Sequence, residues 1–138
     1  MSSSRAASFA RMSRARAPPL APGWCGQQHA CAALAELATH DLMLFVDSDV
    51  RLAPDAAARI AGILRARPEL GLVSGFPRQI VVGWSERLLI PLIHFLLLGF
   101  LPIAAMRRLR APALGAGCGQ LIAVRRDAYR AAGGHAAI

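Results

Sequence analysis

The chain has 138 residues, the size of one domain that can bury a hydrophobic core of its own. Its 16 basic and 8 acidic residues give a formal net charge of +8, which favours an anionic partner such as a phosphate, a nucleic acid or a membrane surface. Three cysteines without a CxxC pair argue against a disulfide framework and a zinc site, and they indicate reduced, cytosolic thiols.

The first 17 residues, MSSSRAASFARMSRARA, are rich in Arg and Ser and contain no acidic residue. They show neither an apolar period nor the apolar core of a secretory signal. We therefore predict a disordered tail over residues 1–17, with a transit peptide as the less favoured alternative. The domain itself is predicted to occupy residues 18–138.

The next segment predicts alternating helices and strands. Apolar residues at helical spacing indicate a helix over residues 27–39. The run LMLFV, residues 42–46, is too short for a typical helix and predicts a strand covered on both faces. A second helix is expected over residues 54–67, because Pro68 disfavours its continuation, and a second strand over residues 70–74. This strand–helix–strand order is typical of a parallel α/β sheet.

Two aspartates follow the first strand directly, in the sequence DSD. Residues i and i+2 of an extended strand point to the same side, so Asp47 and Asp49 are expected to aim at one point beyond its carboxyl end. Carboxylates this close repel each other unless a cation lies between them. Ligands of open α/β sheets bind at the same edge, so the sequence predicts a ligand or cation site there.

A hydrophobic segment, LLIPLIHFLLLGFLPIAAM, spans residues 88–106 without a formal charge and is flanked by arginines. Its length is close to the roughly 20 residues that cross a bilayer, but Pro91, Gly99 and Pro102 disfavour a straight helix. We predict a membrane-associated helix that is interfacial or re-entrant. A true membrane span and a buried core helix are the alternatives.

The last segment begins with the alternating glycines of GAGCGQ, which precede an apolar strand predicted over residues 121–124. A dinucleotide-binding fingerprint therefore fails on both spacing and context. A loop whose backbone closely approaches a ligand fits better. A short helix is expected over residues 126–132, closed by Gly133 and Gly134.

Three motifs, taken in order, resemble the family 2 glycosyltransferases with the GT-A fold, over about residues 18–138. The motif GWCGQQHAC resembles a loop and helix of that family, LFVDSDV its DxD strand, and GAGCGQLIAVRRDAYRAAGGHAAI its acceptor-side segment. The hydrophobic segment is similar to that of members acting on lipid or isoprenoid acceptors, such as hopanoid- and carotenoid-associated enzymes. The resemblance implies a partial GT-A fold, with a Rossmann-like α/β sheet and a membrane-associated helix. It is partial because the family's opening base-binding strand and its later acidic motif have no counterpart here.

The resemblance also implies sugar transfer from a nucleotide-diphospho-sugar to an acceptor, at the cytoplasmic face of a membrane. Asp49 would hold Mg²⁺ or Mn²⁺, and Asp47 would contact the donor's ribose or the water shell of the metal. Trp24 would cover the donor or simply anchor its loop, and Gln27 stands where the family often has Lys. The residues implied on the acceptor side are Gly117, Gly119, Gln120 and His135. His135 is also the candidate for reaching the reaction centre, although a histidine at a helix end more often has a plain surface role.

Other classes remain as alternatives. A haloacid dehalogenase-like phosphatase also places DxD after an apolar strand, but it usually has Thr or Val where Arg51 stands. No nucleic-acid partner is expected, because the arginines outside the tail are scattered and 6% aromatic residues offer no stacking platform. Arg78 and Gln79 could face either phosphate or solvent. The main rival is a non-catalytic, membrane-associated remnant of the enzyme, and we expect the chain alone not to turn over sugar nucleotide.

Overall fold

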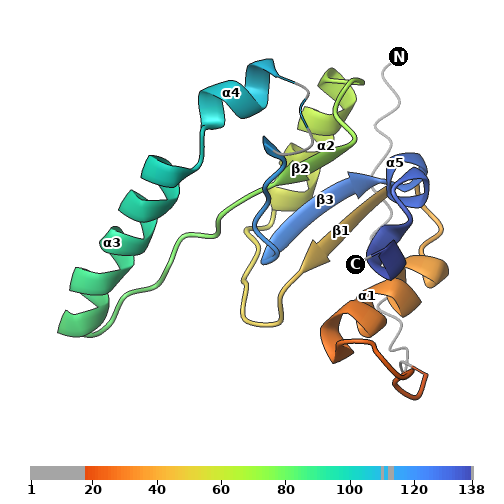
Figure 1. Ribbon diagram of the computed structural model, residues 1–138, viewed down its shortest axis with the longest axis horizontal. Helices are drawn as coiled ribbons and strands as arrows, with labels where there is room; N and C mark the ends of the chain where they lie inside the picture. The colour runs from red at the N-terminus through yellow and green to blue at the C-terminus, as the bar shows by residue number, and fades with distance from the viewer. Residues whose placement is uncertain (1–17, 110, 112–113, 138) are drawn as a thin grey trace, which may run out of the picture. The chain divides into compact units, whose positions relative to one another are not determined.

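The structure is a computed structural model that describes residues 18–109, 111 and 114–137 (Figure 1). The tail predicted over residues 1–17 lies outside the described residues. The described residues divide into two compact units, one formed by residues 18–39 together with 133–137, and the other by the described residues between 40 and 132. The elements of the second unit are β1 (Leu42–Val46), α2 (Ala56–Ala66), β2 (Leu72–Ser74), α3 (Trp84–Phe100), α4 (Ile103–Arg108), β3 (Leu121–Arg125) and α5 (Arg126–Ala131).

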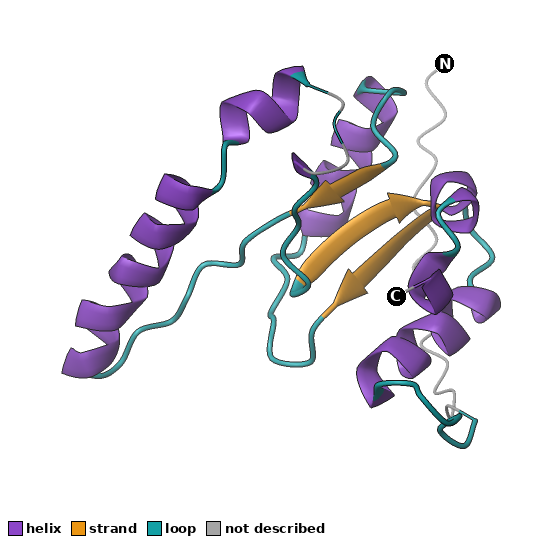
Figure 2. Ribbon diagram, in the orientation of Figure 1, coloured by secondary structure: helices purple, strands orange, loops and turns teal. Residues whose placement is uncertain are grey.

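The sheet of this unit has three strands in the order β1-β3-β2, drawn in orange in Figure 2. Both outer strands pair antiparallel with β3, with Val46 opposite Leu121 and Ser74 opposite Ile122. The predicted α/β class is confirmed, but the predicted parallel pairing is wrong. The two outer strands do run in the same direction, as a strand–helix–strand unit requires, yet β3 lies between them and separates them.

The core of the unit is small and uses both faces of the sheet, because the adjacent β3 residues Ala123 and Val124 are both buried and point to opposite faces. Its buried apolar side chains are Met43, Leu64, Ala123 and Val124, and Leu64 on α2 is fully buried. Arg125, at the end of β3, fastens α2 to the sheet through hydrogen bonds from its guanidinium to the carbonyl oxygens of Leu64 and Leu70. Charged donors of this kind make stronger hydrogen bonds than neutral ones, so Arg125 strengthens a junction with few apolar contacts.

Strand β1 is less covered than its composition predicts. Only Met43 is buried along it, and its other residues are half-exposed. Phe45 stacks on Tyr129 of α5 with ring centroids 5.7 Å apart, which covers part of one face. The prediction of a strand covered on both faces is therefore wrong for the described residues, since an all-apolar run also fits the edge of a small sheet.

The hydrophobic segment predicted over residues 88–106 forms two helices instead of one. Helix α3 ends at Phe100, and α4 begins at Ile103, with Pro102 at its N-terminal boundary. Proline has no N–H to continue the hydrogen bonding of the preceding helix, which accounts for the break. Within the described residues, neither helix has the length and apolar character needed to cross a bilayer.

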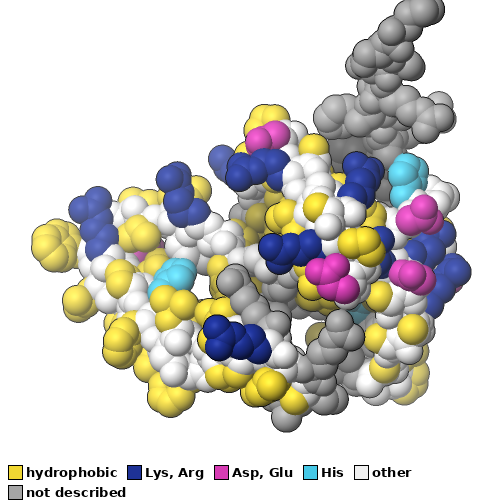
Figure 3. Space-filling view, turned by 90° about the horizontal axis from the view of Figure 1, so that it is seen from above, with side chains coloured by type: hydrophobic (Ala, Val, Ile, Leu, Met, Phe, Trp, Pro, Cys, Tyr) yellow, Lys and Arg dark blue, Asp and Glu magenta, His cyan; other side chains and the backbone are white. Residues whose placement is uncertain are grey.

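None of the residues of α3 is buried, so the alternative of a buried core helix is also wrong. Leu88, Phe95 and Phe100 are each more than 70% exposed. Figure 3 shows hydrophobic side chains in yellow on the visible face of the molecule, interspersed with arginines in dark blue. The N-terminus of α3 is held by Glu86, whose Oε2 accepts hydrogen bonds from the backbone N–H groups of Val82 and Gly83, at 2.7 and 2.9 Å.

The first unit contains α1 (Gly26–Leu37) and the short 3₁₀ helix η2 (Gly134–Ala137), which contact each other. The predicted helix over residues 27–39 is thereby confirmed with slightly different bounds. Gly133 and Gly134, predicted to close the last helix, adopt positive φ values of 78° and 59°. This left-handed conformation strongly favours glycine, so the GG pair is required by the turn between α5 and η2.

Candidate functional site

The DSD sequence forms a turn at the end of β1. The Asp47 N–H donates to the carbonyl oxygen of Gln120 at 3.0 Å, which extends the pairing with β3 by one step, and the Val50 N–H donates back to the Asp47 carbonyl oxygen at 3.1 Å. The chain therefore stops being extended before Asp49. The side-chain alternation of an extended strand, on which the expected convergence of the two carboxylates was based, therefore does not apply here. Asp47 is half-buried, whereas Asp49 is exposed.

The glycine-rich loop before β3 is held against the end of β2 by one serine. Ser74 Oγ donates to the Cys118 carbonyl oxygen at 3.0 Å and accepts from the Cys118 N–H at 2.6 Å. A Cβ added at Gly117 would lie 3.4 Å from the Ser74 side chain, so the loop backbone passes close to the strand. Gln120, at the end of this loop, is thus fixed in the position where its carbonyl oxygen receives the Asp47 N–H.

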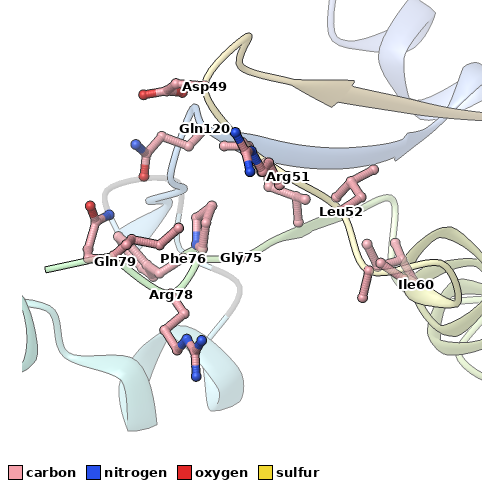
Figure 4. A pocket seen from close by; sticks show the side chains of 15 residues that line it. Asp49, Arg51, Leu52, Ile60, Gly75, Phe76, Arg78, Gln79 and Gln120 are labelled. Atoms are coloured by element: carbon pink, nitrogen blue, oxygen red, sulfur yellow. The ribbon is translucent and has the colours of Figure 1, made fainter.

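Asp49 opens onto a pocket of about 810 Å³, which is within the size range of small-molecule sites (Figure 4). Its walls come from the loop after β1, the start of α2, the chain after β2 and the start of β3. Among the described lining residues, the charged side chains are those of Asp49, Arg51 and Arg78, and the side-chain amides are those of Gln79 and Gln120. Leu52, Ile60, Phe76 and Ile80 contribute apolar surface.

The two arginines of the pocket differ in direction. Figure 4 shows the Arg51 side chain extending toward the side on which Asp49 and Gln120 lie, whereas the Arg78 guanidinium points away from Asp49. Within the part of the chain that the structure describes, the ion pair found is Arg59–Asp55 at 3.8 Å, so neither pocket arginine is engaged by a described carboxylate. Both guanidinium groups are exposed and can meet an anion.

A divalent metal fits this site only if another bound molecule supplies part of its coordination shell. The described residues contain no group of three or more His, Cys, Asp and Glu side chains that could hold a metal ion. Mg²⁺ is commonly bound by one or two carboxylates together with waters and the oxygens of a substrate phosphate. Asp49, with or without Asp47, therefore suits a cation that arrives with an anionic donor better than a permanently resident one.

The remaining residues predicted for the site belong to the first unit. The Trp24 and His29 rings meet edge to face, with centroids 5.6 Å apart, which fits Trp24 as an anchor of its loop. Gln27 is exposed at the start of α1. His135 lies on η2, and burial lowers its pKa below the ordinary value of 6.5, so it is neutral at pH 7 and able to accept a proton.

The structure thus brings together Asp49 and Gln120 in one pocket, with Asp47 bonded to the Gln120 backbone. Gly117 and Gly119 are exposed on the loop that leads to Gln120, and neither lines the pocket among the described residues. The role of Ser74 was not predicted from the sequence. Its one signal was a hydroxyl at the end of the apolar stretch LGLV, a place where a side chain often bonds a neighbouring loop.

Comparison with known proteins identifies the family. The family model for glycosyl transferase family 21 matches residues 26–138, which include the DSD turn and the whole pocket. Neither a curated protein nor a solved structure matches the chain. Family 2, which the motifs resemble, is a different family and is not confirmed, although the broader prediction of a glycosyltransferase is. The chain belongs to glycosyl transferase family 21.

Proposed function

We propose that this protein transfers a sugar from a nucleotide-diphospho-sugar to an acceptor, and that the Asp49 pocket receives the diphosphate of the donor. The observation that carries the proposal is the exposed Asp49 carboxylate on a fixed turn, facing a pocket lined by cationic and amide side chains. The family supports sugar transfer over the alternative of a haloacid dehalogenase-like phosphatase.

The site must stabilise the negative charge of the leaving diphosphate. As the glycosidic bond of the donor breaks, negative charge grows on the leaving nucleoside diphosphate, and groups that stabilise that charge accelerate the reaction. Mg²⁺ or Mn²⁺, when bound with the diphosphate, would supply Lewis-acid stabilisation of this charge. Asp49 would hold the metal, and Asp47, whose backbone is fixed by Gln120, would contact the ribose or a water of the metal.

The other predicted residues take supporting roles in this proposal. Gln120 presents its side chain to the pocket, while its Oε1 lies 3.7 Å from the Cys118 thiol and accepts a weak hydrogen bond from it. Gly117 and Gly119 are exposed, and the backbone at Gly119, where an added Cβ would meet nothing within 4 Å, suits close approach of an acceptor. Trp24 and Gln27 are proposed on the donor side, and His135, neutral at pH 7, is proposed as an acceptor-side base.

A lipid or isoprenoid is proposed as the acceptor, with the protein at the cytoplasmic face of a membrane. The support is α3, a helix without a buried residue whose large apolar side chains are exposed. Such a surface is favourable at the boundary between lipid headgroups and acyl chains. Sedimentation with anionic phospholipid vesicles tests this: the double variant Phe95→Ser/Leu98→Ser should bind vesicles several-fold less than the parent protein. Equal sedimentation of the two proteins would refute the membrane role of α3.

Nucleotide binding tests the central proposal. UDP binding measured by calorimetry should tighten when Mn²⁺ is added to the parent protein, and Asp49→Asn should abolish that dependence while preserving side-chain size. Asp55→Asn is the matched control, because Asp55 is also an exposed aspartate but lies outside the pocket. The same Mn²⁺-dependent gain in the Asp49 variant as in the control would refute the assignment. UDP binding without turnover of any sugar nucleotide would favour the non-catalytic alternative.

A further inference from the structure

The pocket contains a cationic side chain, that of Arg51, which is not part of the proposed metal site. Arg51 follows the DSD turn by two residues and lines the same pocket as Asp49. Its guanidinium forms no ion pair with Asp49 or with any other described carboxylate, although it extends toward the same side of the pocket (Figure 4). A cation with a structural role would be expected to bond to neighbouring carboxylates or carbonyl groups, as Arg125 does with Leu64 and Leu70.

The backbone around Arg51 restricts where its side chain can reach. The Asp47 N–H donates a hydrogen bond to the Gln120 carbonyl oxygen, which fixes one end of the turn, and the Val50 N–H donates to the Asp47 carbonyl oxygen, which closes it. Helix α2 begins a few residues later, at Ala56, where the Ala56 N–H bonds the Ala53 carbonyl oxygen. Arg51 therefore projects from a short segment anchored at both ends, which lowers the cost of ordering the side chain around a ligand.

The chemistry of a diphosphate matches such a group. A guanidinium presents parallel N–H donors that can bond two phosphate oxygens at once, and these charge-assisted bonds are stronger than neutral ones. A site with two aspartates and one divalent cation has little positive charge left to neutralise a diphosphate. A second cation from the protein corrects that balance without requiring a third metal ligand, and none is available among the described side chains.

We infer that Arg51 is a diphosphate-binding residue that contacts the phosphate oxygens of the donor directly, in parallel with the metal held by Asp49. The inference rests on the proposed function, because it assumes that a nucleoside diphosphate occupies this pocket. It assigns two separable contributions to binding: one depends on metal and on Asp49, and the other depends on Arg51 with or without metal.

Arg78 provides a matched control. It lines the same pocket and carries the same charge, but its guanidinium points away from Asp49 in Figure 4. A loss of affinity that reflects only the general electrostatic field would be similar for Arg51→Ala and Arg78→Ala. A loss from direct contact would be confined to Arg51, and Arg51→Lys would restore only part of it because an ammonium cannot bond two oxygens in the same fork geometry.

The experiment measures dissociation constants of UDP and of inorganic pyrophosphate for the full chain, by calorimetry, with Mg²⁺ and again with a chelator. Circular dichroism verifies that each variant is folded. We expect Arg51→Ala to weaken both ligands by about tenfold or more, equivalent to about 1.4 kcal/mol, under both conditions. Arg78→Ala should weaken them by less than about threefold, which is about 0.7 kcal/mol. Asp49→Asn should remove the effect of Mg²⁺ but retain binding that is sensitive to Arg51.

The outcomes separate this inference from the function on which it rests. Equal effects of Arg51→Ala and Arg78→Ala, with Asp49-dependent Mg²⁺ binding intact, would overturn the role of Arg51 and leave the proposed function standing. Binding that needs Arg51 but is indifferent to Asp49 and Mg²⁺ would support Arg51 and refute the metal assignment. A parent protein that binds neither ligand would overturn both.

Discussion

Replacement of Ser74 by alanine should release the glycine-rich loop from the sheet. The Ser74 hydroxyl makes two hydrogen bonds to the backbone of Cys118, one as donor and one as acceptor, and both are partly buried. A typical intramolecular hydrogen bond contributes about 0.5–1.5 kcal/mol, so loss of the pair should cost roughly 1–3 kcal/mol in the local opening free energy of the loop. That range corresponds to a change of roughly 5- to 150-fold in the opening equilibrium.

Amide hydrogen exchange followed residue by residue by NMR measures this opening directly. The Cys118 N–H should exchange roughly 5- to 150-fold faster in Ser74→Ala than in the parent, while the buried Val124 amide on β3 should change much less. Ser74→Thr retains the hydroxyl and is the matched control, with exchange at Cys118 close to that of the parent. An unchanged Cys118 exchange rate in Ser74→Ala would refute the argument that this hydroxyl holds the loop.

Three further outcomes follow from local features. Leu64→Ala should reduce the free energy of unfolding by about 2–5 kcal/mol in urea denaturation, because Leu64 is fully buried, whereas Ile63→Ala, at an exposed neighbouring position, should cost much less. Gly133→Ala should lower the free energy of unfolding by about 1–3 kcal/mol in the same assay, since φ at this position is +78°. The Cβ of the new alanine would also lie 2.9 Å from the Cβ of Ala137. Hydrogen bonds from the backbone N–H groups of Gly83 and Val82 lower the pKa of Glu86 below its ordinary value of 4.5. The carboxylate therefore stabilises the N-terminus of α3 fully above pH 4.5, and this stabilisation should be lost as the pH falls through the lowered pKa of the folded state. Exchange of the Val82 and Gly83 amides, expressed relative to the intrinsic exchange rate at each pH, should accelerate over that acidic range. A relative acceleration of the same size in Glu86→Ala would refute the role of the carboxylate.

Local chemistry made most of the elements predictable from the sequence. The apolar run at Leu42–Val46 predicted β1 with its observed bounds, and the apolar spacing predicted α2 to within two residues. The turn at Gly133 and Gly134 followed from the backbone freedom of glycine. These features depend on a few neighbouring residues, so a single sequence is sufficient to specify them.

Features that depend on distant pairing were not predictable in the same way. The order β1-β3-β2 depends on a strand that lies far along the chain, and no local pattern indicates that β3 inserts between the other two. The Ser74–Cys118 contact joins residues 44 positions apart, so Ser74 had no motif to identify it. Asp49 was predicted as a site residue from DSD, but the apolar pattern does not encode the turn that ends the extended backbone before it.

The place of β3 in the sheet has a consequence for how the protein forms during synthesis. Strand β3 is synthesised after β1 and β2, yet both of these strands bond to it and not to each other. Pairing of Val46 with Leu121 closes a loop of roughly 75 residues, for which the logarithmic length term of the closure entropy is about 4 kcal/mol. The edges of β1 and β2 therefore stay open on the nascent chain until β3 leaves the ribosome, and during that interval they can pair with other chains. The Asp47–Gln120 hydrogen bond joins the same two ends, so the DSD turn reaches its folded position only after this late closure.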